Sequence, residues 1–262
     1  MTGDITRRDR LVALALAGLV AALAWAFTLH QARVMEAMDA AMWRDMNMSM
    51  NGMQASWTPL EAALVFVMWS AMMAAMMLPG SAPMIAAFAI INRRRRERAD
   101  PSVPTAVFLS GYLAVWVGFS IVATALQWTL QRAELLTTML QSASNWFSAG
   151  LFLAASAYQF SPLKERCLTL CRSPDGFILS EWRDGALGAS VMGLRHGMFC
   201  LGCCAGLMLL LFAVAVMDLR WVACLTALVT AEKLLPGRYW RPLIGAVLLA
   251  TGLGFAVAAV RA

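Results

Sequence analysis

Long apolar segments alternate with short polar stretches along the whole chain. A helix that rises about 1.5 Å per residue needs roughly 20 residues to cross hydrocarbon about 30 Å thick. The apolar segments cover residues 11–29, 58–91, 104–130, 145–160, 186–217, 221–235 and 243–260. The pattern therefore predicts an all-α fold, a polytopic transmembrane helical bundle of about seven helices. Because 145–160 and 221–235 are short for a span, six helices and a re-entrant element are an alternative.

The composition supports a membrane protein. Of the 262 residues, 61% are hydrophobic and 14% are charged, which is too little charge to cover the surface of a soluble protein. The net charge of +6 comes without a nucleic-acid-binding motif, and no phosphate-binding loop or phosphorylated aspartate motif is present. We therefore expect the lipid bilayer as the main partner, with no nucleic acid and no ATP.

The basic residues lie mainly on one side of the predicted spans, at a ratio of roughly three to one. This bias places the N-terminus in the cytoplasm and the C-terminus outside. Because no loop is long enough to fold alone, residues 1–262 are expected to form a single integral membrane domain. Residues 1–57 would hold the first span and a Met-rich outer loop, and residues 58–262 the helical core. A cleaved signal peptide over the first segment is an alternative.

Methionines are concentrated in the predicted outer loop. Seven of the 19 methionines lie in residues 35–53, together with three acidic residues. Thioethers are soft, uncharged ligands that bind Cu(I) in an oxidising compartment without forming disulfides. The alternative is an amphipathic helix lying in the membrane interface. The candidate ligands of this loop are Met35, Met38, Met42 and Met46.

The second apolar segment repeats methionine every four residues, at Met68, Met72 and Met76. On a helix these three positions share one stripe, which predicts a relay of soft ligands. Packing or lipid-facing filler is the alternative, because methionine is a flexible apolar side chain. The segment is longer than a bilayer is thick, and Pro and Gly within 79–83 predict a kink or a broken helix.

The strongest motif is a His-Gly-x-x-Cys-x-Gly-Cys-Cys run in the fifth apolar segment. On a helix, His196, Cys200, Cys203 and Cys204 share a face about 100° wide, and such donors suit Cu(I) or Zn(II). Residues seven apart lie about 10 Å apart along the axis, so a partner helix must supply further ligands, or there are two sites. Two alternatives stay open, namely glycine-mediated helix packing and thiol redox chemistry at the CxxC pair of Cys200 and Cys203.

Three further features involve cysteines and charged residues outside this motif. Cys167 and Cys171 lie among basic residues in a predicted cytoplasmic loop, where nearby cations would lower the thiol pKa and favour a metal donor or acceptor site. Cys224 stands alone in the sixth segment, so we expect it to serve packing. Glu232 ends that segment, and a pair with Arg195 is the simplest way to satisfy a cation within the membrane.

Several motifs together resemble a known bacterial family. They are the methionine pairs ending in proline within 69–83, Tyr158-Gln159 followed by Pro162, Lys164, Cys167, Cys171, Arg172 and Pro174, the run 193–204, and Glu232-Lys233-Leu234-Leu235-Pro236. From residue 60 onward, the chain is similar to the predicted metal-binding integral membrane proteins of domain of unknown function 2182. The resemblance implies metal binding but carries no settled activity.

We predict a multi-pass protein of the bacterial inner (plasma) membrane that binds a soft transition metal for transport or delivery. The expected metal is Cu(I), with Zn(II) as an alternative. The outer methionines would capture the ion, the stripe of the second span would relay it, and His196 with the three neighbouring cysteines would hold it. A periplasmic metal-binding protein or another membrane subunit is the expected partner. The competing classes are a membrane thiol-disulfide oxidoreductase using Cys200 and Cys203, and a metal-free assembly or scaffold subunit. We predict no catalytic residue.

Overall fold

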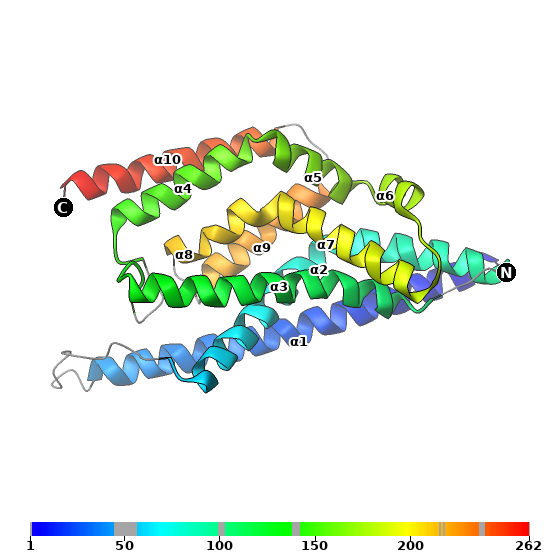
Figure 1. Ribbon diagram of the computed structural model, residues 1–262, viewed down its shortest axis with the longest axis horizontal. Helices are drawn as coiled ribbons and strands as arrows, with labels where there is room; N and C mark the ends of the chain where they lie inside the picture. The colour runs from blue at the N-terminus through cyan, green and yellow to red at the C-terminus, as the bar shows by residue number, and fades with distance from the viewer. Residues whose placement is uncertain are drawn as a thin grey trace.

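The computed structural model describes residues 2–44, 57–98, 103–137, 142–214, 216, 218–235 and 239–261. These residues form helices, and their one bridge of β type joins Leu136 and Ser142, so the predicted all-α class is confirmed. The helices are α1 (Thr2–Arg44), α2 (Pro59–Glu97), α3 (Thr105–Arg132), α4 (Asn145–Gln159), α5 (Pro162–Arg172), α6 (Pro174–Glu181), α7 (Gly185–Leu209), α8 (Leu211–Val214), α9 (Leu219–Leu234) and α10 (Trp240–Arg261), as Figure 1 shows.

Five helical stretches of the described chain are long and apolar enough to cross a membrane. They are Leu14–Val34, Pro59–Arg95, Thr105–Arg132, Gly185–Val214 and Trp240–Arg261. The other two predicted spans also form helices, but α4 has 15 residues and α9 has 16, which is short for the hydrocarbon layer. The number of seven spans and the orientation of the termini stay predictions.

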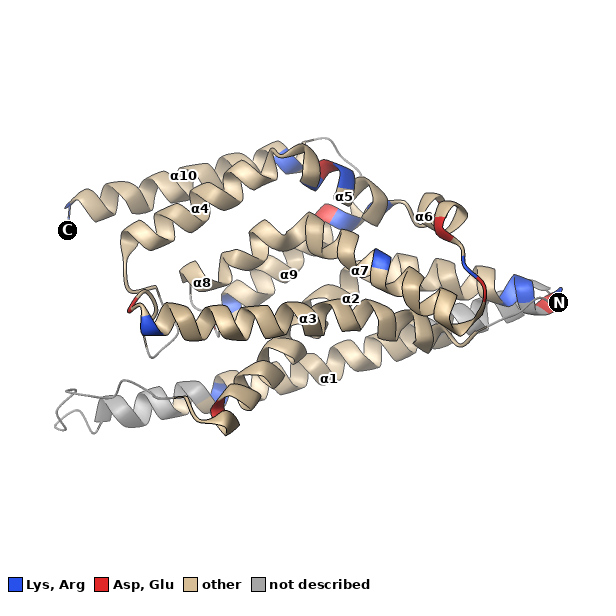
Figure 2. Cartoon of the chain, viewed as in Figure 1, with Lys and Arg blue, Asp and Glu red and all other residues tan. Residues whose placement is uncertain are grey.

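The helices pack in pairs. α1 lies along α2, α3 lies along α7, and α4 lies along α10 (Figure 1). The outer faces of α1 and α10 expose large apolar side chains, among them Leu19, Leu23, Val247 and Leu253. Charged residues lie mostly near helix ends, and the long middle parts of α1, α3 and α10 carry none (Figure 2). Apolar outer faces and uncharged middles are what a lipid environment requires.

The first helix is longer than the sequence predicts. A polar loop was expected from residue 30, but α1 continues to Arg44, so Met35, Met38 and Met42 have helical backbone. Residues 30–44 contain neither Gly nor Pro and are rich in Ala and Met, which are good helix formers. Met46, the fourth candidate ligand of this region, lies outside the described residues.

The second helix is continuous, so a broken helix, one of the two predicted forms, is wrong, while the kink stays a prediction. Pro79 and Pro83 both lie inside α2. Because Pro79 has no N–H, it leaves the carbonyl of Ala75 without its helical donor, and the indole nitrogen of Trp25 in α1 donates to that oxygen at 3.1 Å. The hydroxyl of Ser81 donates to the carbonyl of Leu78 at 3.0 Å. Side-chain donors of this kind let a helix contain proline within a membrane.

Close packing of α7 on α3 depends on glycine. A Cβ atom on Gly193 would overlap the backbone oxygen of Phe108, and one on Gly111 would overlap the backbone oxygen of Ser190. The two backbones therefore approach as closely as glycine allows. Glycine-mediated packing, one of the two alternatives for this motif, is thus present in the structure. This packing on α3 uses glycines of α7, whereas the cysteines of α7 contact other helices.

Candidate metal centre

The three cysteines of α7 are buried in the centre of the protein. Cys203 and Cys204 direct their thiols to the backbone oxygen of Cys200, at 3.1 and 2.8 Å. All three side chains are almost completely shielded from solvent. The geometry gathers three soft sulfur atoms within one helical turn, as the sequence pattern predicts.

Cys200 has partners from three other helices. Its sulfur lies 3.2 Å from the hydroxyl of Tyr112 in α3 and accepts a hydrogen bond from the ammonium of Lys233 in α9 at 3.0 Å. The thiol of Cys171 in α5 is close enough to Cys200 and Cys203 for both of them to raise its pKa. Cys200 is therefore the residue on which these helices converge.

A methionine of α2 completes this cluster. The sulfur of Met77 lies 3.9 Å from the sulfur of Cys204 and 3.8 Å from the ammonium of Lys233. Tyr112 donates its hydroxyl proton to the backbone oxygen of Met77 at 3.2 Å, which ties α2 to α3 at the same level. We call the following seven residues the thiol cluster: Met77, Tyr112, Cys171, Cys200, Cys203, Cys204 and Lys233.

Helix α5 is held over the cluster by a buried ion pair. The ammonium of Lys164 lies 2.8 Å from a carboxylate oxygen of Glu232, and their side chains are 1% and 2% exposed. Gln159 bridges the two, accepting from Lys164 at 2.6 Å and donating to Glu232. Arg172, at the other end of α5, donates to the backbone oxygen of Glu232 at 2.6 Å.

The predicted pair of Glu232 with Arg195 is therefore wrong. Arg195 pairs with Glu181 of α6 at the edge of the protein, where its side chain is partly exposed. A buried carboxylate pairs with a cation that is buried beside it, which here is Lys164. Gln159 supplies the hydrogen bonds that these buried charges also need. The choice of partner is a tertiary property that the spacing along the chain does not encode.

The pKa prediction for the thiols of α5 is also wrong. Burial, with a smaller contribution from Cys203, raises the pKa of the Cys167 thiol, whereas the sequence predicts that nearby cations lower it. Hydrogen bonding to Cys200 and Cys203, together with burial, raises the pKa of the Cys171 thiol well above its ordinary value. The nearby cations Lys164 and Arg172 are engaged with Glu232. Burial therefore decides the direction of the pKa shift for Cys167, and interactions with Cys200 and Cys203 decide it for Cys171.

All six cysteines are free thiols in the described chain, and their exposure differs. Cys167 is half-buried, and its sulfur lies against Gly202, where a Cβ atom would approach it to 2.7 Å. Tyr158 donates to the backbone oxygen of the same glycine. Cys224 is exposed on the outer face of α9, so the expected packing role within the protein is wrong.

His196 lies beside the thiol cluster without joining it. Its imidazole is 1% exposed and stacks on Tyr112 and Phe108, with ring centroids 5.5 and 6.2 Å apart. Neither ring nitrogen has a hydrogen-bond partner among the described residues. Within the same residues, no three His, Cys, Asp or Glu side chains form a group suited to a metal ion. A site on the cysteines of α7 must therefore draw a donor of another kind from another helix, and the thioether of Met77 is such a donor in place.

The methionine stripe of α2 is buried along its whole length. Met68, Met72 and Met76 are shielded from solvent and belong to the same apolar core as the cysteines. Near the Met68 end, the indole of Trp69 stacks on Phe212 at 5.2 Å. The residue that reaches the thiols is Met77, which lies about 100° around the helix from Met76.

Sequence reasoning missed three members of the cluster, namely Met77, Tyr112 and Lys233. A signal existed for Lys233, because a lysine at the end of an apolar segment is expensive unless it has an interior partner. The paired methionines at 76 and 77 mark two helix faces, and the sequence does not show which face meets the thiols. Tyr112 has no distinguishing sequence signal, since an isolated aromatic residue in a span is ordinary.

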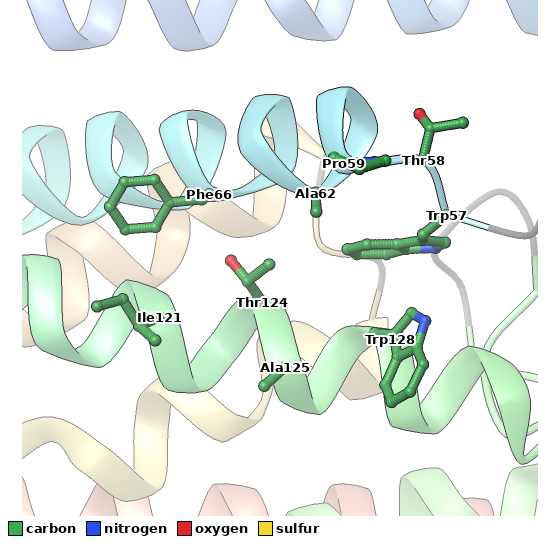
Figure 3. A pocket seen from close by; sticks show the side chains of 9 residues that line it. All are labelled: Trp57, Thr58, Pro59, Ala62, Phe66, Ile121, Thr124, Ala125 and Trp128. Carbon is green, nitrogen blue, oxygen red and sulfur yellow. The ribbon is translucent and has the colours of Figure 1, made fainter.

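A separate groove lies at the far end of α2. It has a volume of about 460 Å³ and opens between the start of α2 and the end of α3 (Figure 3). Its walls are Trp57, Thr58, Pro59, Ala62, Phe66, Ile121, Thr124, Ala125 and Trp128. These side chains offer no thiol, thioether or imidazole. The guanidinium of Arg132 lies 4.4 Å from the centre of the Trp128 ring, and tryptophans beside arginine are typical of a membrane interface.

Long apolar helices surround a buried set of thiols, a thioether and an ammonium. The class is therefore an all-α protein with soft-metal donors in its core and with helices compatible with membrane insertion. The comparison with protein families agrees with this class and narrows it. The chain belongs to the PpoB2 copper chaperone family, whose model matches residues 66–255. The matched range contains the whole thiol cluster and begins after the Met-rich region 35–53. No curated protein and no solved structure matched the chain.

Proposed function

We propose that the protein is a multi-pass copper chaperone of the bacterial inner membrane that carries Cu(I) as cargo in the thiol cluster. The observation that carries the proposal is the convergence of buried sulfur from three helices, with Met77 from α2, Cys171 from α5 and Cys200 and Cys204 from α7. Thiolates and thioethers are the ligands that select Cu(I), and membership of a copper chaperone family points to the same metal. Zn(II) is the alternative cargo.

The spacing of the sulfurs supports such a site. Metal–sulfur bonds of about 2.3 Å, the length known for zinc thiolates, place two ligands of a trigonal ion roughly 4 Å apart. The sulfurs of Cys204 and Met77 are 3.9 Å apart. The ammonium of Lys233 contacts the sulfurs of both Met77 and Cys200, so Cys200 lies beside this pair as the proposed third ligand. Burial would protect the bound ion from water and from oxidation.

The proposed route follows the soft donors along the helices. Capture is assigned to Met35, Met38, Met42 and Met46, and relay to Met68, Met72 and Met76. Holding is assigned to Cys200, Cys203 and Cys204 with Met77, and His196 is a further ligand beside them. Cys167 and Cys171 in α5 pass the ion to a partner, because Cys167 is half-buried and lies against α7. A periplasmic metal-binding protein or another membrane subunit is the proposed partner at the capture end.

Metal analysis of matched variants tests the proposal. Purified protein in detergent is loaded with Cu(I) under reducing, oxygen-free conditions, and bound copper is measured by mass spectrometry. We expect about one tightly held copper per chain in the wild type, and at least a tenfold loss of affinity in Cys200→Ser, since one soft ligand contributes on the order of 1.4 kcal/mol or more.

Two pairs of variants provide the controls. Met77→Leu should weaken binding, whereas Met198→Leu changes the same residue type at an exposed position of α7 and should leave the affinity of the thiol cluster unchanged. Cys224→Ser removes a thiol from the outer face and should have no effect. Wild-type protein that retains no stoichiometric copper would refute the proposal. A disulfide between Cys200 and Cys203, trapped without copper, would support the oxidoreductase instead.

A further inference from the structure

Lys233 places a cation where soft donors meet. Its side chain is 6% exposed, and its ammonium lies 3.0 Å from the sulfur of Cys200 and 3.8 Å from the sulfur of Met77. A thioether is a poor partner for an ammonium but a good ligand for Cu(I). The ammonium therefore lies between two atoms that would both prefer a soft metal ion.

The ordinary partner of a buried lysine is absent from this contact. The adjacent carboxylate, Glu232, is already paired with Lys164 and Gln159 on the other side of α9. Among the described residues, the hydrogen-bond acceptors of the Lys233 ammonium are the sulfurs of Cys200 and Met77. The lysine is thus bound to the thiol cluster and not to the neighbouring ion pair.

The stem of Lys233 packs closely on a glycine of α2. A Cβ atom on Gly80 would come to 2.9 Å from the Lys233 Cδ atom and 3.5 Å from its Nζ atom. Glycine at this position leaves room for the stem where it lies. A lysine has four rotatable side-chain bonds, so its ammonium can leave Cys200 without any change in the helix backbone.

We infer that the Lys233 ammonium holds the place of the copper ion in the metal-free protein and competes with Cu(I) for Cys200 and Met77. The inference rests on the proposed function and adds how the site loads and unloads. Cu(I) and an ammonium both carry one positive charge, so either can be the cation beside the sulfur of Cys200. If both stayed, they would repel each other in surroundings that screen charge poorly.

This exchange suits a chaperone. When the ion is loaded, Lys233 moves away from Cys200, and when the ion leaves, the ammonium returns to the sulfur and leaves no unpaired charge behind. A returning internal cation lowers the affinity for copper and speeds its release. The site is therefore expected to hand copper on more readily than the same sulfur donors would without the lysine.

A pair of substitutions at position 233 tests the inference. Lys233→Leu removes the cation and adds no metal ligand, while Lys233→Arg retains the charge. Copper affinity is measured by competition with a chromophoric Cu(I) chelator, and the release rate is measured by stopped-flow transfer to the same chelator. We expect Lys233→Leu to bind Cu(I) about 10- to 100-fold more tightly and to release it more slowly, because a like charge has been removed from the site. Lys233→Arg should not gain affinity.

A second variant keeps the lysine and displaces it. Gly80→Ala pushes the Lys233 stem aside, so its copper affinity should also rise, while Gly254→Ala, which adds a methyl group in open space on α10, should not change it. Gly80→Ala decides the question if Lys233→Leu fails to fold. Wild type that binds no copper would refute the proposed function itself. If the wild type binds copper and Lys233→Leu binds it equally or more weakly, only the competition is overturned, because the lysine would then act as a counter-ion of the loaded site. Where Lys233→Leu does not fold, the same result in Gly80→Ala has the same meaning.

Discussion

The pair of Lys164 and Glu232 connects the stability of the fold to the position of the thiols. Glu232→Gln keeps the shape of the side chain and removes its charge, which leaves the Lys164 ammonium buried without a carboxylate. The two charges lie 2.8 Å apart, and at an effective dielectric constant of about 20 their Coulomb attraction is about 6 kcal/mol. Part of this is retained through the hydrogen bond of Lys164 to Gln159. We therefore expect the free energy of unfolding to fall by about 3–5 kcal/mol.

A double-mutant cycle separates this pair from general damage. Lys164→Met, Glu232→Gln and the double variant are unfolded by denaturant in detergent, followed by tryptophan fluorescence. Each single change leaves a buried charge without its partner, whereas the double change removes both charges, so the double variant should be more stable than either single one. Glu165→Gln serves as a control, because it breaks the partly exposed pair with Arg241 and should cost about 0–1 kcal/mol. Strictly additive costs in the double variant would refute the reasoning.

Two further predictions concern single positions. Gly193→Ala should lower the free energy of unfolding by about 1–3 kcal/mol or more, because its Cβ atom would overlap the Phe108 backbone. In the same unfolding assay, Gly118→Ala, on the open side of α3, should be tolerated. Alkylation of Cys167, followed by mass spectrometry, should be slower at neutral pH than for a free cysteine and should accelerate as the pH rises through its raised pKa, since the thiolate is the nucleophile. A Cys167 rate at neutral pH above that of free cysteine would contradict this.

The helical class and the thiol face of α7 follow from strong local patterns. Apolar runs of about 20 residues leave few alternatives to a helix, and the spacing of Cys200 and Cys204 is one turn, so both must lie on neighbouring positions of one face. These features depend on the period of the helix alone. The extension of α1 to Arg44 does not follow from the hydropathy pattern, because charged and polar residues after residue 29 indicate a loop, although the same residues form helix readily.

The rest of the site depends on tertiary contacts. α5 looks like a polar loop in the sequence, and tertiary contacts such as the buried pair of Lys164 and Glu232 bring its Cys171 close to Cys200. The rotation of α2 decides that Met77 and not Met76 meets the thiols. Neither the partner of a buried charge nor the rotation of a helix is encoded in the spacing of residues along one segment. These are therefore the points at which the sequence prediction fails.

Retention and release make opposite demands on a chaperone, and the structure offers a physical basis for both in the proposed function. The three buried thiols of α7 and Met77 can hold Cu(I) away from water, while half-buried Cys167 lies against the same helix and gives the ion a way to a partner. α5 carries both Cys167 and Cys171, so the ion pair that fixes this helix also fixes the distance over which copper must pass. Loosening that pair should therefore weaken handover before it weakens binding, because the donors of α7 and α2 stay in place.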